Sequence, residues 1–282
     1  MRQFANEKAR FYYPPSSGKN LADTTHMCIA AHQDDIEIMA ASAILECFGK
    51  SDKNFTGVTV TDGAGSPRTG IYESITDEDM KKIRAAEQDT AAAIGCYNAQ
   101  FQLYYPSSAV KDSKNAGLVN ELKEIITAAS PNFLYMHNFA DKHDTHVAVA
   151  LRTLEALRQI PKESRPQKVY SMEVWRSLDW VRDDEKLLFD TSQDEFLQAA
   201  LLGVYHSQIA GGKRYDEACL GRKRANATYV ATHNTDDYAA AEYGIDITEL
   251  VNDDSLTPTQ FISRFIENFK QDVIDRLAKF SP

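Results

Sequence analysis

The sequence predicts an α/β fold, namely a Rossmann-like, doubly wound and mostly parallel sheet flanked by helices. Short apolar runs of strand length alternate along the chain with segments of helical periodicity. Two of these runs end directly in clusters of histidine and aspartate, and ligands collect beyond the carboxyl ends of strands in open α/β sheets. The length of 282 residues is enough for a large buried core. We therefore expect one domain over residues 1–282, with 1–25 as an N-terminal extension and 251–282 as a C-terminal helical segment.

The expected elements follow from this alternation in chain order. Residues 1–25 lack periodicity and carry turn-forming residues, so we expect them to wrap the surface or to meet another subunit. The apolar runs predict strands at Met27–Ala31, Phe55–Val60, Ala99–Tyr104, Phe133–Met136 and Lys168–Trp175. The helical patterns predict helices at Asp35–Phe48, Asp77–Ile94, Gly117–Ala129, His143–Arg158, Asp194–Ala210 and Pro258–Lys279. Pro161 and Pro166 mark residues 159–167 as a connector between a helix and a strand.

The stretch His32-Gln33-Asp34-Asp35 places an imidazole and two carboxylates on one turn, directly after the first expected strand. Adjacent aspartates repel each other, so both stay ionised in a region of low dielectric only if a cation or a proton lies between them. A metal ion would meet that need. The alternative is that one aspartate caps the following helix, whose N-terminal dipole favours an acidic residue. Capping requires only one of the two.

A second cluster follows the strand Phe133–Met136. Three of the seven histidines lie between His137 and His146. His143 and His146 are three residues apart, which places both rings on one face of a helical turn. Zinc binds imidazole nitrogen and carboxylate oxygen, and catalytic zinc usually has three protein ligands and a water. His32, Asp35 and His146 would supply such a set, unless these histidines are solvated loop residues or bond to helix ends.

Together these motifs resemble those of the LmbE/PIG-L family of zinc-dependent sugar N-deacetylases, which read Ala-His-Pro-Asp-Asp and His-x-x-His. Here they stand as Ala31–Asp35 and His143–His146, and Ile36-Glu37 is similar to the branch of bacillithiol biosynthesis. Weaker similarities are a glycine-rich loop, an Arg-x-x-Glu helix, a His-x-Gln element and a closing strand, at residues 61–70, 84–95, 206–208 and 238–243. The resemblance covers about residues 25–250.

The resemblance implies a role for each matching residue. His32, Asp35 and His146 become the ligands of Zn²⁺, Asp34 the general base and His143 the second catalytic group. Either Asp34 or His143 can protonate the leaving amine, and the sequence leaves that choice open. Arg84, Asp62 and Gln208 become substrate-binding residues. A surface ion pair of Arg84 with Glu87 or Glu78 is the alternative.

Three departures from the family pattern bear on these roles. Gln33 replaces the usual proline, which loosens a turn without removing a chemical group. Thr145 stands where the family commonly has an aspartate that orients the neighbouring imidazole, so Asp141 or Asp144 would have to substitute. Residues 102–108 lack an acidic residue that relatives often carry, which leaves the identity of the substrate open.

Composition excludes several other classes of partner. A net charge of −10 without a dense Lys/Arg stripe argues against nucleic acid and against anionic membranes, and Arg222-Lys223-Arg224 is interpreted as a solvated face. There is no run of about 18 apolar residues for membrane insertion and no signal-peptide core. The four cysteines are widely separated and are interpreted as reduced core residues. We expect a cytoplasmic protein, and the resemblance implies a homo-oligomer.

The leading hypothesis is a zinc-dependent hydrolase that removes the acetyl group from an N-acetylated amino sugar, a small GlcNAc-type conjugate. The same chemistry on a non-sugar N-acyl group or an ester is one alternative. A catalytically silent carbohydrate-binding protein is another, with Thr145 and the missing acidic residue as its hints. Trp175 and Trp180 can stack on a sugar ring or lie in the core, and both alternatives stay open.

Overall fold

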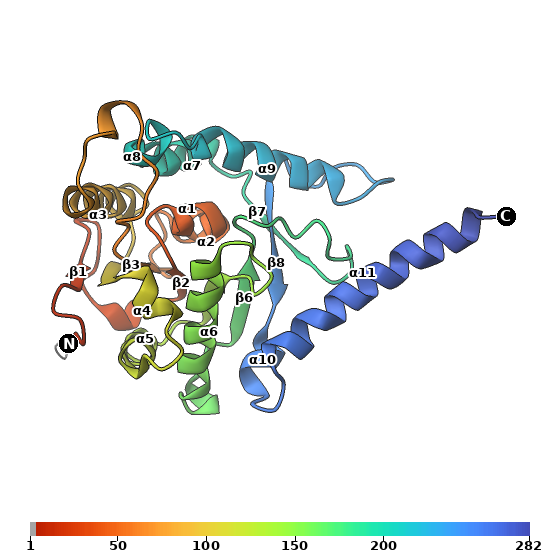
Figure 1. Cartoon of the computed structure of the whole chain (residues 1–282), viewed down its shortest axis with the longest axis horizontal. Helices are drawn as coiled ribbons and strands as arrows, with labels where there is room; N and C mark the ends of the chain where they lie inside the picture. The colour runs from red at the N-terminus through yellow and green to blue at the C-terminus, as the bar shows by residue number, and fades with distance from the viewer. Residues whose placement is uncertain (1–3) are drawn as a thin grey trace.

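The computed structural model describes residues 4–282, and its centre is an eight-stranded sheet in the order β1-β4-β3-β2-β5-β6-β8-β7 (Figure 1). The strands are β1 Arg10–Tyr12, β2 His26–Ala30, β3 Phe55–Thr61, β4 Ala99–Tyr105, β5 Phe133–His137, β6 Lys168–Met172, β7 Leu187–Asp190 and β8 Ala241–Asp246. The five strands from β4 to β6 in this order pair in parallel, whereas β1, β7 and β8 pair antiparallel. The prediction of a mostly parallel α/β sheet is confirmed.

The order of the parallel strands creates a switch point between β2 and β5. The chain runs outward from β2 through β3 to β4, and then returns to place β5 and β6 on the other side of β2. The loops that leave β2 and β5 therefore diverge, and they leave a crevice at the carboxyl ends of these neighbouring strands. Both polar clusters found in the sequence follow these two strands.

Helices cover both faces of the sheet (Figure 1). They are α1 Asp35–Met39, α2 Ala41–Cys47, α3 Asp77–Ile94, α4 Ser107–Lys111, α5 Ala116–Ala129, α6 Asp144–Arg158, α7 Glu195–Gly203, α8 His206–Ile209, α9 Tyr215–Tyr229, α10 Thr248–Asn252 and α11 Pro258–Phe280. Short 3₁₀ turns lie at Leu21–Asp23, Gly70–Tyr72 and Lys162–Ser164.

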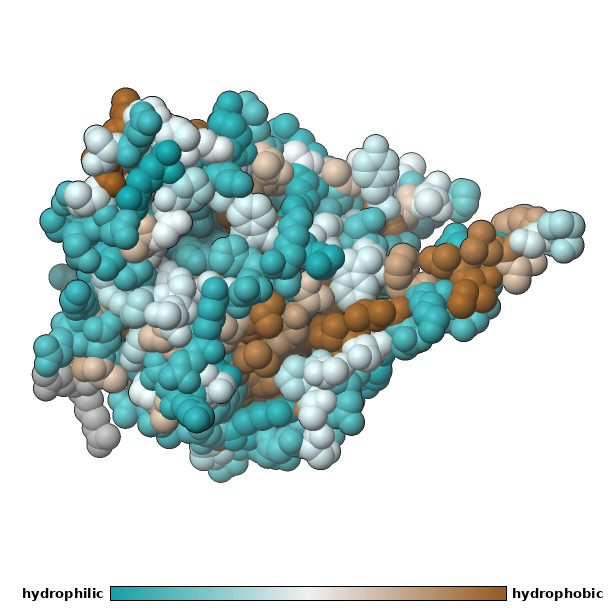
Figure 2. All heavy atoms as spheres, in the orientation of Figure 1, coloured by the Kyte–Doolittle hydropathy of each residue, from teal (hydrophilic) through white to brown (hydrophobic). Residues whose placement is uncertain are grey.

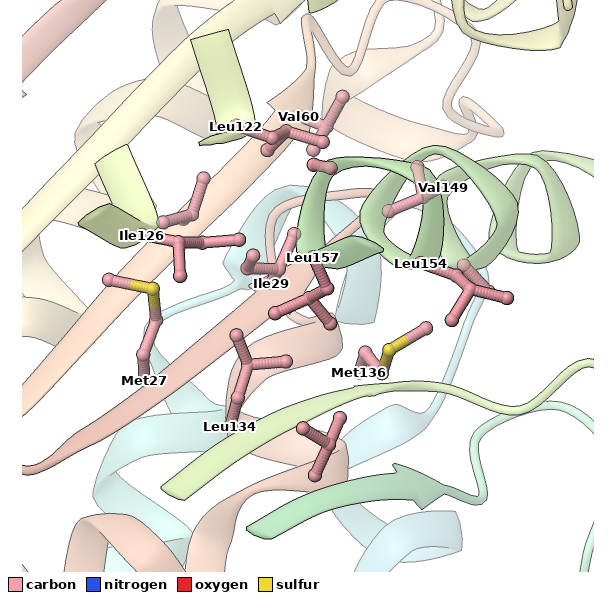
Figure 3. Packing of buried hydrophobic residues seen from close by; sticks show 14 of the residues in the cluster. Met27, Ile29, Val60, Leu122, Ile126, Leu134, Met136, Val149, Leu154 and Leu157 are labelled. Atoms are coloured by element: carbon pink, nitrogen blue, oxygen red, sulfur yellow. The ribbon is translucent and has the colours of Figure 1, made fainter. Parts of the chain in front are cut away.

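Alternation along β2 divides the core into two layers. Met27 and Ile29 point toward α5 and α6, where Figure 3 shows them with Leu134, Ile126 and Leu157. Cys28 and Ala30 point the other way, into the cluster formed by α1, α2 and part of α3 and α7. Every residue of β2 is buried, which is why it reads as a continuous apolar run rather than an alternating one. A fully buried strand thus supports the turn that carries His32–Asp35.

Several element boundaries differ from the prediction. The expected helix Asp35–Phe48 breaks at Ala40, whose backbone angles of −129° and 27° are not helical. The expected helix Asp194–Ala210 divides into α7 and α8, and the expected strand Lys168–Trp175 ends at Met172. The helices α4, α9 and α10 and the strands β1 and β7 were not predicted, because they are short or lack a clear apolar periodicity. The closing strand expected at 238–243 is observed as β8, three residues later at each end.

The two ends of the chain behave differently. Residues of the N-terminal extension add β1 to the edge of the sheet beside β4 and pack Phe4 and Phe11 on the core, so the described part of the extension wraps the surface. At the other end, a capping box of Thr257 and Gln260 begins α11, which projects beyond the body of the molecule (Figure 1). Figure 2 shows an apolar stripe along this helix. Its exposed members are Ile266, Phe269, Val273, Ile274, Leu277 and Phe280.

Within residues 4–282, none of the helices combines the length and the apolar character needed to cross a membrane.

Candidate metal centre

The fold brings the two polar clusters together at the switch point. His32, Asp34 and Asp35 lie on the turn between β2 and α1, while His143 and His146 lie at the start of α6, after β5. The Nδ1 atom of His32 is 3.1 Å from Oδ2 of Asp35 and 3.1 Å from Nε2 of His146. The same Asp35 oxygen is 3.2 Å from Nε2 of His146. Three ligand-type atoms from two distant segments therefore form a nearly equilateral triangle.

This triangle has the dimensions of one face of a tetrahedral zinc site. Zinc binds imidazole nitrogen and carboxylate oxygen at about 2.0–2.2 Å, so two ligand atoms at a tetrahedral angle lie roughly 3.3 Å apart. The three edges measured here are close to that value. The donor set is also chemically suitable, with two imidazoles and one carboxylate. His32, Asp35 and His146 therefore fit a zinc ion.

The electrostatics of the triangle also favour a positive charge. Burial raises the pKa of the Asp35 carboxyl, but His146 and His137 outweigh burial and hold this pKa well below its usual value. Burial lowers the pKa of His146, but the carboxylates of Asp35 and Asp141 outweigh it and raise this pKa to about 9. Without a metal ion, a proton on His146 provides the positive charge that Asp35 requires. A divalent cation would take the place of that proton.

His137 is a member of the site that the sequence did not assign. It is the last residue of β5, and its ring stacks on His146 with centroids 3.9 Å apart. Burial, followed by the nearby His146, lowers the pKa of His137 to about 4, so the ring is neutral. Its Nε2 atom accepts a hydrogen bond of 2.8 Å from the backbone N–H of Ala31. The Nε2 atom of His137 also lies 3.5 Å from Oδ2 of Asp35, so the ring packs behind the triangle.

Asp34 lies next to the triangle in an unusual backbone conformation. Its φ of 94° is positive, which a residue other than glycine adopts only when its surroundings impose it. The residue is 4% exposed, and the Oδ2 atom of its side chain is 3.2 Å from Nη2 of Arg84. Burial raises the pKa of the Asp34 carboxyl well above its usual value, with Arg84 as the main opposing influence.

Arg84 on α3 connects Asp34 to the glycine-rich loop. Besides Asp34, its guanidinium donates to the carbonyl oxygen of Gln33 and, at 2.5 Å, to the hydroxyl of Ser66. The alternative of a surface ion pair is wrong, because Arg84 is 4% exposed and the carboxylates proposed for that pair bond elsewhere. Glu87 accepts from the backbone and hydroxyl of Ser207, and Glu78 pairs with Lys81.

His143 is the N-cap residue of α6. Its Nδ1 atom accepts a hydrogen bond of 3.3 Å from the backbone N–H of Thr145, so the proton of the neutral ring resides on Nε2. The ring lies edge-on to His32, with centroids 4.9 Å apart. Burial and the two neighbouring histidines, His146 and His32, lower the pKa of His143 to about 4.

Of the two carboxylates expected to replace the aspartate missing at position 145, Asp141 lies near the histidines and Asp144 does not. The Oδ2 atom of Asp141 is 3.7 Å from Nδ1 of His146, and its Oδ1 atom accepts a hydrogen bond of 2.8 Å from the backbone N–H of His143. Asp144 is exposed to solvent. The nearby carboxylate therefore comes from the loop before α6, where it bonds the backbone of His143 and lies beside the His146 ring without a hydrogen bond to it.

The triangle opens into a cleft of about 510 Å³. His32, Asp34, Asp35, Arg84, His143 and Gln208 line it, as do the loop Gly63–Pro67 and residues of α4 and α9. Asp62 does not line the cleft, because its carboxylate turns toward Lys81 at 3.1 Å and toward the backbone N–H of Ala64 at 3.2 Å. The position of Asp62 therefore does not support the predicted contact with substrate, which stays a prediction. Gln208, the other residue predicted to bind substrate, does line the cleft.

The cleft also corrects the interpretation of Arg222-Lys223-Arg224 as a solvated face. Arg222 is half-buried and lines the cleft, and Lys223 is buried 3.3 Å from the carboxylate of Glu242. Only Arg224 is exposed, where it pairs with Glu195. Trp175 also lines the cleft, with its ring centroid 6.3 Å from that of His143.

Comparison with solved structures identifies a shared fold. N,N'-diacetylchitobiose deacetylase from Pyrococcus horikoshii is 14% identical with a TM-score of 0.63, covering 82% of this chain and 86% of that one. The conserved protein TT1542 from Thermus thermophilus is 16% identical with a TM-score of 0.62, covering 79% and 94%. GalB, the 4-carboxy-2-hydroxymuconate hydratase from Pseudomonas putida, is 17% identical with a TM-score of 0.59, covering 79% and 96%. A hydratase among these structures means that the fold alone does not fix the reaction.

A comparison with curated protein sequences finds no match. Residues 27–157 match the family described as PIG-L, GlcNAc-PI de-N-acetylase. This segment begins in β2 and ends in α6, so it contains the three residues of the triangle together with Asp34, Arg84 and His143. The part of the chain that holds the triangle is therefore similar to the PIG-L family of de-N-acetylases.

Proposed function

We propose that this protein is a zinc-dependent hydrolase that removes the acetyl group from an N-acetylated amino sugar, a GlcNAc-type conjugate. The observation that carries the proposal is the triangle of His32, Asp35 and His146, with the buried carboxylate of Asp34 beside it. The family description and the similarity to a diacetylchitobiose deacetylase support an N-acetylated sugar as the substrate class. When bound, zinc would supply an acidified water and a Lewis acid for the amide carbonyl.

Asp34 is suited to hold the proton that moves during hydrolysis. Arg84 engages only its Oδ2 atom, and among residues 4–282 no hydrogen bond is formed to Oδ1. The Arg84 contact fixes the plane of the carboxylate, and the positive φ aims it into the cleft. A general base must lie within hydrogen-bond reach of the proton it removes, which requires such fixed placement.

His143 is suited to act on the other side of the amide. Its Nδ1 atom is bound by the backbone of Thr145, so Nε2–H is the group left to donate. A donor in the cleft can stabilise negative charge on the carbonyl oxygen or assist protonation of the leaving amine. Arg84 and Gln208 line the same cleft, and we propose that they contact the sugar. We propose a sugar contact for Asp62 too, on the basis of the sequence alone.

The experiment is acetate release from a panel of GlcNAc conjugates by zinc-loaded protein, compared with chelated protein. Asp34→Asn serves as the variant that keeps the ligand set, with zinc content measured on the same sample. Zinc-dependent acetate release that Asp34→Asn abolishes while zinc is retained supports the proposal. Full zinc occupancy without acetate release from any conjugate contradicts the proposal and favours a carbohydrate-binding protein. Hydrolysis of non-sugar amides or esters alone favours the same zinc chemistry on a non-sugar substrate.

We also propose that residues 1–282 form a single domain, that the protein is a homo-oligomer and that it is located in the cytoplasm. The four cysteines are free, three of them buried, which is consistent with a reducing compartment. Cys96 is exposed, so the interpretation of all four as core residues holds for Cys28, Cys47 and Cys219 only. Size-exclusion chromatography with light scattering would measure the subunit count.

A further inference from the structure

The cleft around the candidate metal centre carries more positive than negative charge, although the whole chain has a net charge of −10. Its lining includes four permanent cations, Arg84, Lys111, Lys213 and Arg222, and two carboxylates, Asp34 and Asp35. Both carboxylates are already engaged, Asp34 by Arg84 and Asp35 by the histidines of the triangle. The charge of the other three cations is therefore not balanced from within the cleft.

Two of these cations lie beside Trp175, which connects them to the metal centre. The Nζ atom of Lys213 is 5.1 Å from the centre of the Trp175 ring, and Arg222 donates to the carbonyl oxygen of Val174. The backbone N–H of Trp175 in turn donates to Asp141 at 3.0 Å, the carboxylate that contacts His146. Lys213 and Arg222 are thus anchored close to the triangle, on the α9 side of the cleft.

Neither Lys213 nor Arg222 has a carboxylate within ion-pair distance among residues 4–282. Their neighbour Arg214 differs, because it faces out and pairs with Asp216 and Glu217. Arg222 is half-buried, and its one hydrogen bond, from Nη1 to the carbonyl of Val174, leaves Nε and Nη2 for a ligand. A partly buried guanidinium without a counter-ion is unfavourable unless a ligand supplies one.

We infer that the cleft binds a substrate with an anionic group, a phosphate or a carboxylate, held by Arg222 and Lys213 while the acetamide lies at the metal centre. This inference rests on the proposed deacetylase function and narrows its substrate to acidic amino-sugar conjugates. A guanidinium binds either anion through paired N–H donors, and the ammonium group of Lys213 adds a second positive charge. The exposed Lys111 adds positive potential at the same cleft and attracts an anion from solution.

Hydrolysis of matched substrates tests the inference. The substrates are methyl N-acetylglucosaminide, which is neutral, N-acetylglucosamine 1-phosphate and 6-phosphate, and N-acetylmuramic acid, which carries a carboxylate. We expect kcat/KM for at least one anionic substrate to exceed that of the neutral glycoside by roughly tenfold or more, since hydrogen bonds between charged groups are stronger than those between neutral groups. Comparison of the two phosphorylated sugars with N-acetylmuramic acid shows whether the cleft prefers a phosphate or a carboxylate. Equal or lower kcat/KM for all anionic substrates overturns the inference.

Charge-removing variants locate the effect. Arg222→Gln and Lys213→Met are each expected to reduce the ratio of kcat/KM for the anionic and neutral substrates at least fivefold. Arg224→Gln is the matched control, because it removes the same charge from the same helix outside the cleft. The side chain of Lys213 makes no hydrogen bond within residues 4–282, so the Lys213→Met variant stays informative even if Arg222→Gln fails to fold. A ratio that Arg224→Gln lowers as much as the cleft variants contradicts the assignment.

Calorimetry separates this inference from the proposed function. Zinc-loaded protein is titrated with glucosamine 6-phosphate, with muramic acid and with glucosamine, which require no turnover. Binding of an acidic amino sugar at least tenfold tighter than glucosamine, lost in Lys213→Met, supports the anion subsite even if no acetate is released from any conjugate. Acetate release without a preference for acidic compounds in either assay keeps the proposed function and overturns the anion subsite.

Discussion

The guanidinium of Arg84 lies 3.2 Å from the carboxylate of Asp34, and both residues are 4% exposed. This ion pair joins α3 to the turn after β2 across 50 positions of sequence. Breaking a buried pair on one side leaves a charge without a partner in a region of low dielectric. The pair therefore couples the placement of the proposed base to the stability of the fold.

Arg84→Met is expected to lower the free energy of unfolding by about 3 kcal/mol, because Asp34 then stays buried without a counter-charge. It should also raise the pKa of Asp34 further, since Arg84 is the main influence that lowers it. Urea denaturation measures the first effect. The control is Lys82→Met on the exposed face of the same helix, where a change within about 0.5 kcal/mol is expected. Equal effects of the two substitutions would rule out this account.

Asp34→Asn is expected to reduce kcat by roughly 10²–10⁴-fold, the usual contribution of a positioned acid–base group. The amide keeps the size of the side chain and cannot accept the proton. Zinc content by atomic emission should stay unchanged, because Asp34 is not one of the three ligand residues. Loss of the metal together with the activity would show instead that Asp34 holds the ion.

Asp141→Asn is expected to weaken metal binding by about 10–100-fold, because the carboxylate that contacts Nδ1 of His146 is lost. Asp144→Asn provides the matched comparison, since it removes the same charge three positions later from an exposed side chain. Competition with a chromogenic chelator gives both affinities. A similar loss in both variants would point to overall charge rather than to orientation of His146.

Zinc is expected to stabilise the protein, because the triangle binds the ion only in the folded state. At free zinc a thousand times above the dissociation constant, the gain is about 4 kcal/mol. Differential scanning fluorimetry should show a higher Tm with zinc and a lower one after chelation. His146→Ala should abolish this shift. His206→Ala is the control, since His206 bonds Tyr72 and is not in the triangle.

Removal of residues 268–282 is expected to leave the fold intact. Phe261 and Ile262 at the start of α11 are buried, whereas the apolar residues from Ile266 onward are substantially exposed. The truncated chain should therefore keep its Tm within a few degrees and show fewer exposed apolar sites to a hydrophobic dye. A large drop in Tm would mean that the distal half of α11 contributes to the core.

Local patterns in the sequence predicted that His32, Asp35 and His146 lie together, whereas a neighbour whose position depends on long-range packing escaped prediction. His32 and Asp35 share one turn, and His146 follows a second apolar strand, so only the adjacency of β2 and β5 had to be inferred. His137 reads in sequence as the end of a strand, and nothing local indicates that its ring stacks on His146. The sequence named Asp141 and Asp144 as candidates to replace the aspartate that is missing at position 145, but nothing local indicated that Asp141 is the one beside His146.

The cationic side of the cleft escaped prediction for a different reason. Helix α9 has mostly polar residues and weak apolar periodicity, so Arg222-Lys223-Arg224 reads as a solvated face. In the folded chain, α9 packs against β8 and α7, which buries Lys223 and turns Arg222 toward the cleft. The helix break at Ala40 also lacks a local signal, because neither proline nor glycine is present there.

The sheet ends in a strand of three residues at β1 and one of four residues at β7. Unpaired backbone groups at a sheet margin act as templates for pairing with other chains, and the risk grows with the length of the exposed row. Here the parallel strands β3, β2 and β5 are enclosed between other strands, and the brief antiparallel strands β1 and β7 lie at the two edges of the described sheet. Slow self-association through cross-strand pairing is therefore suppressed by the architecture itself, even while the centre of the sheet is rich in the residues that amyloid favours.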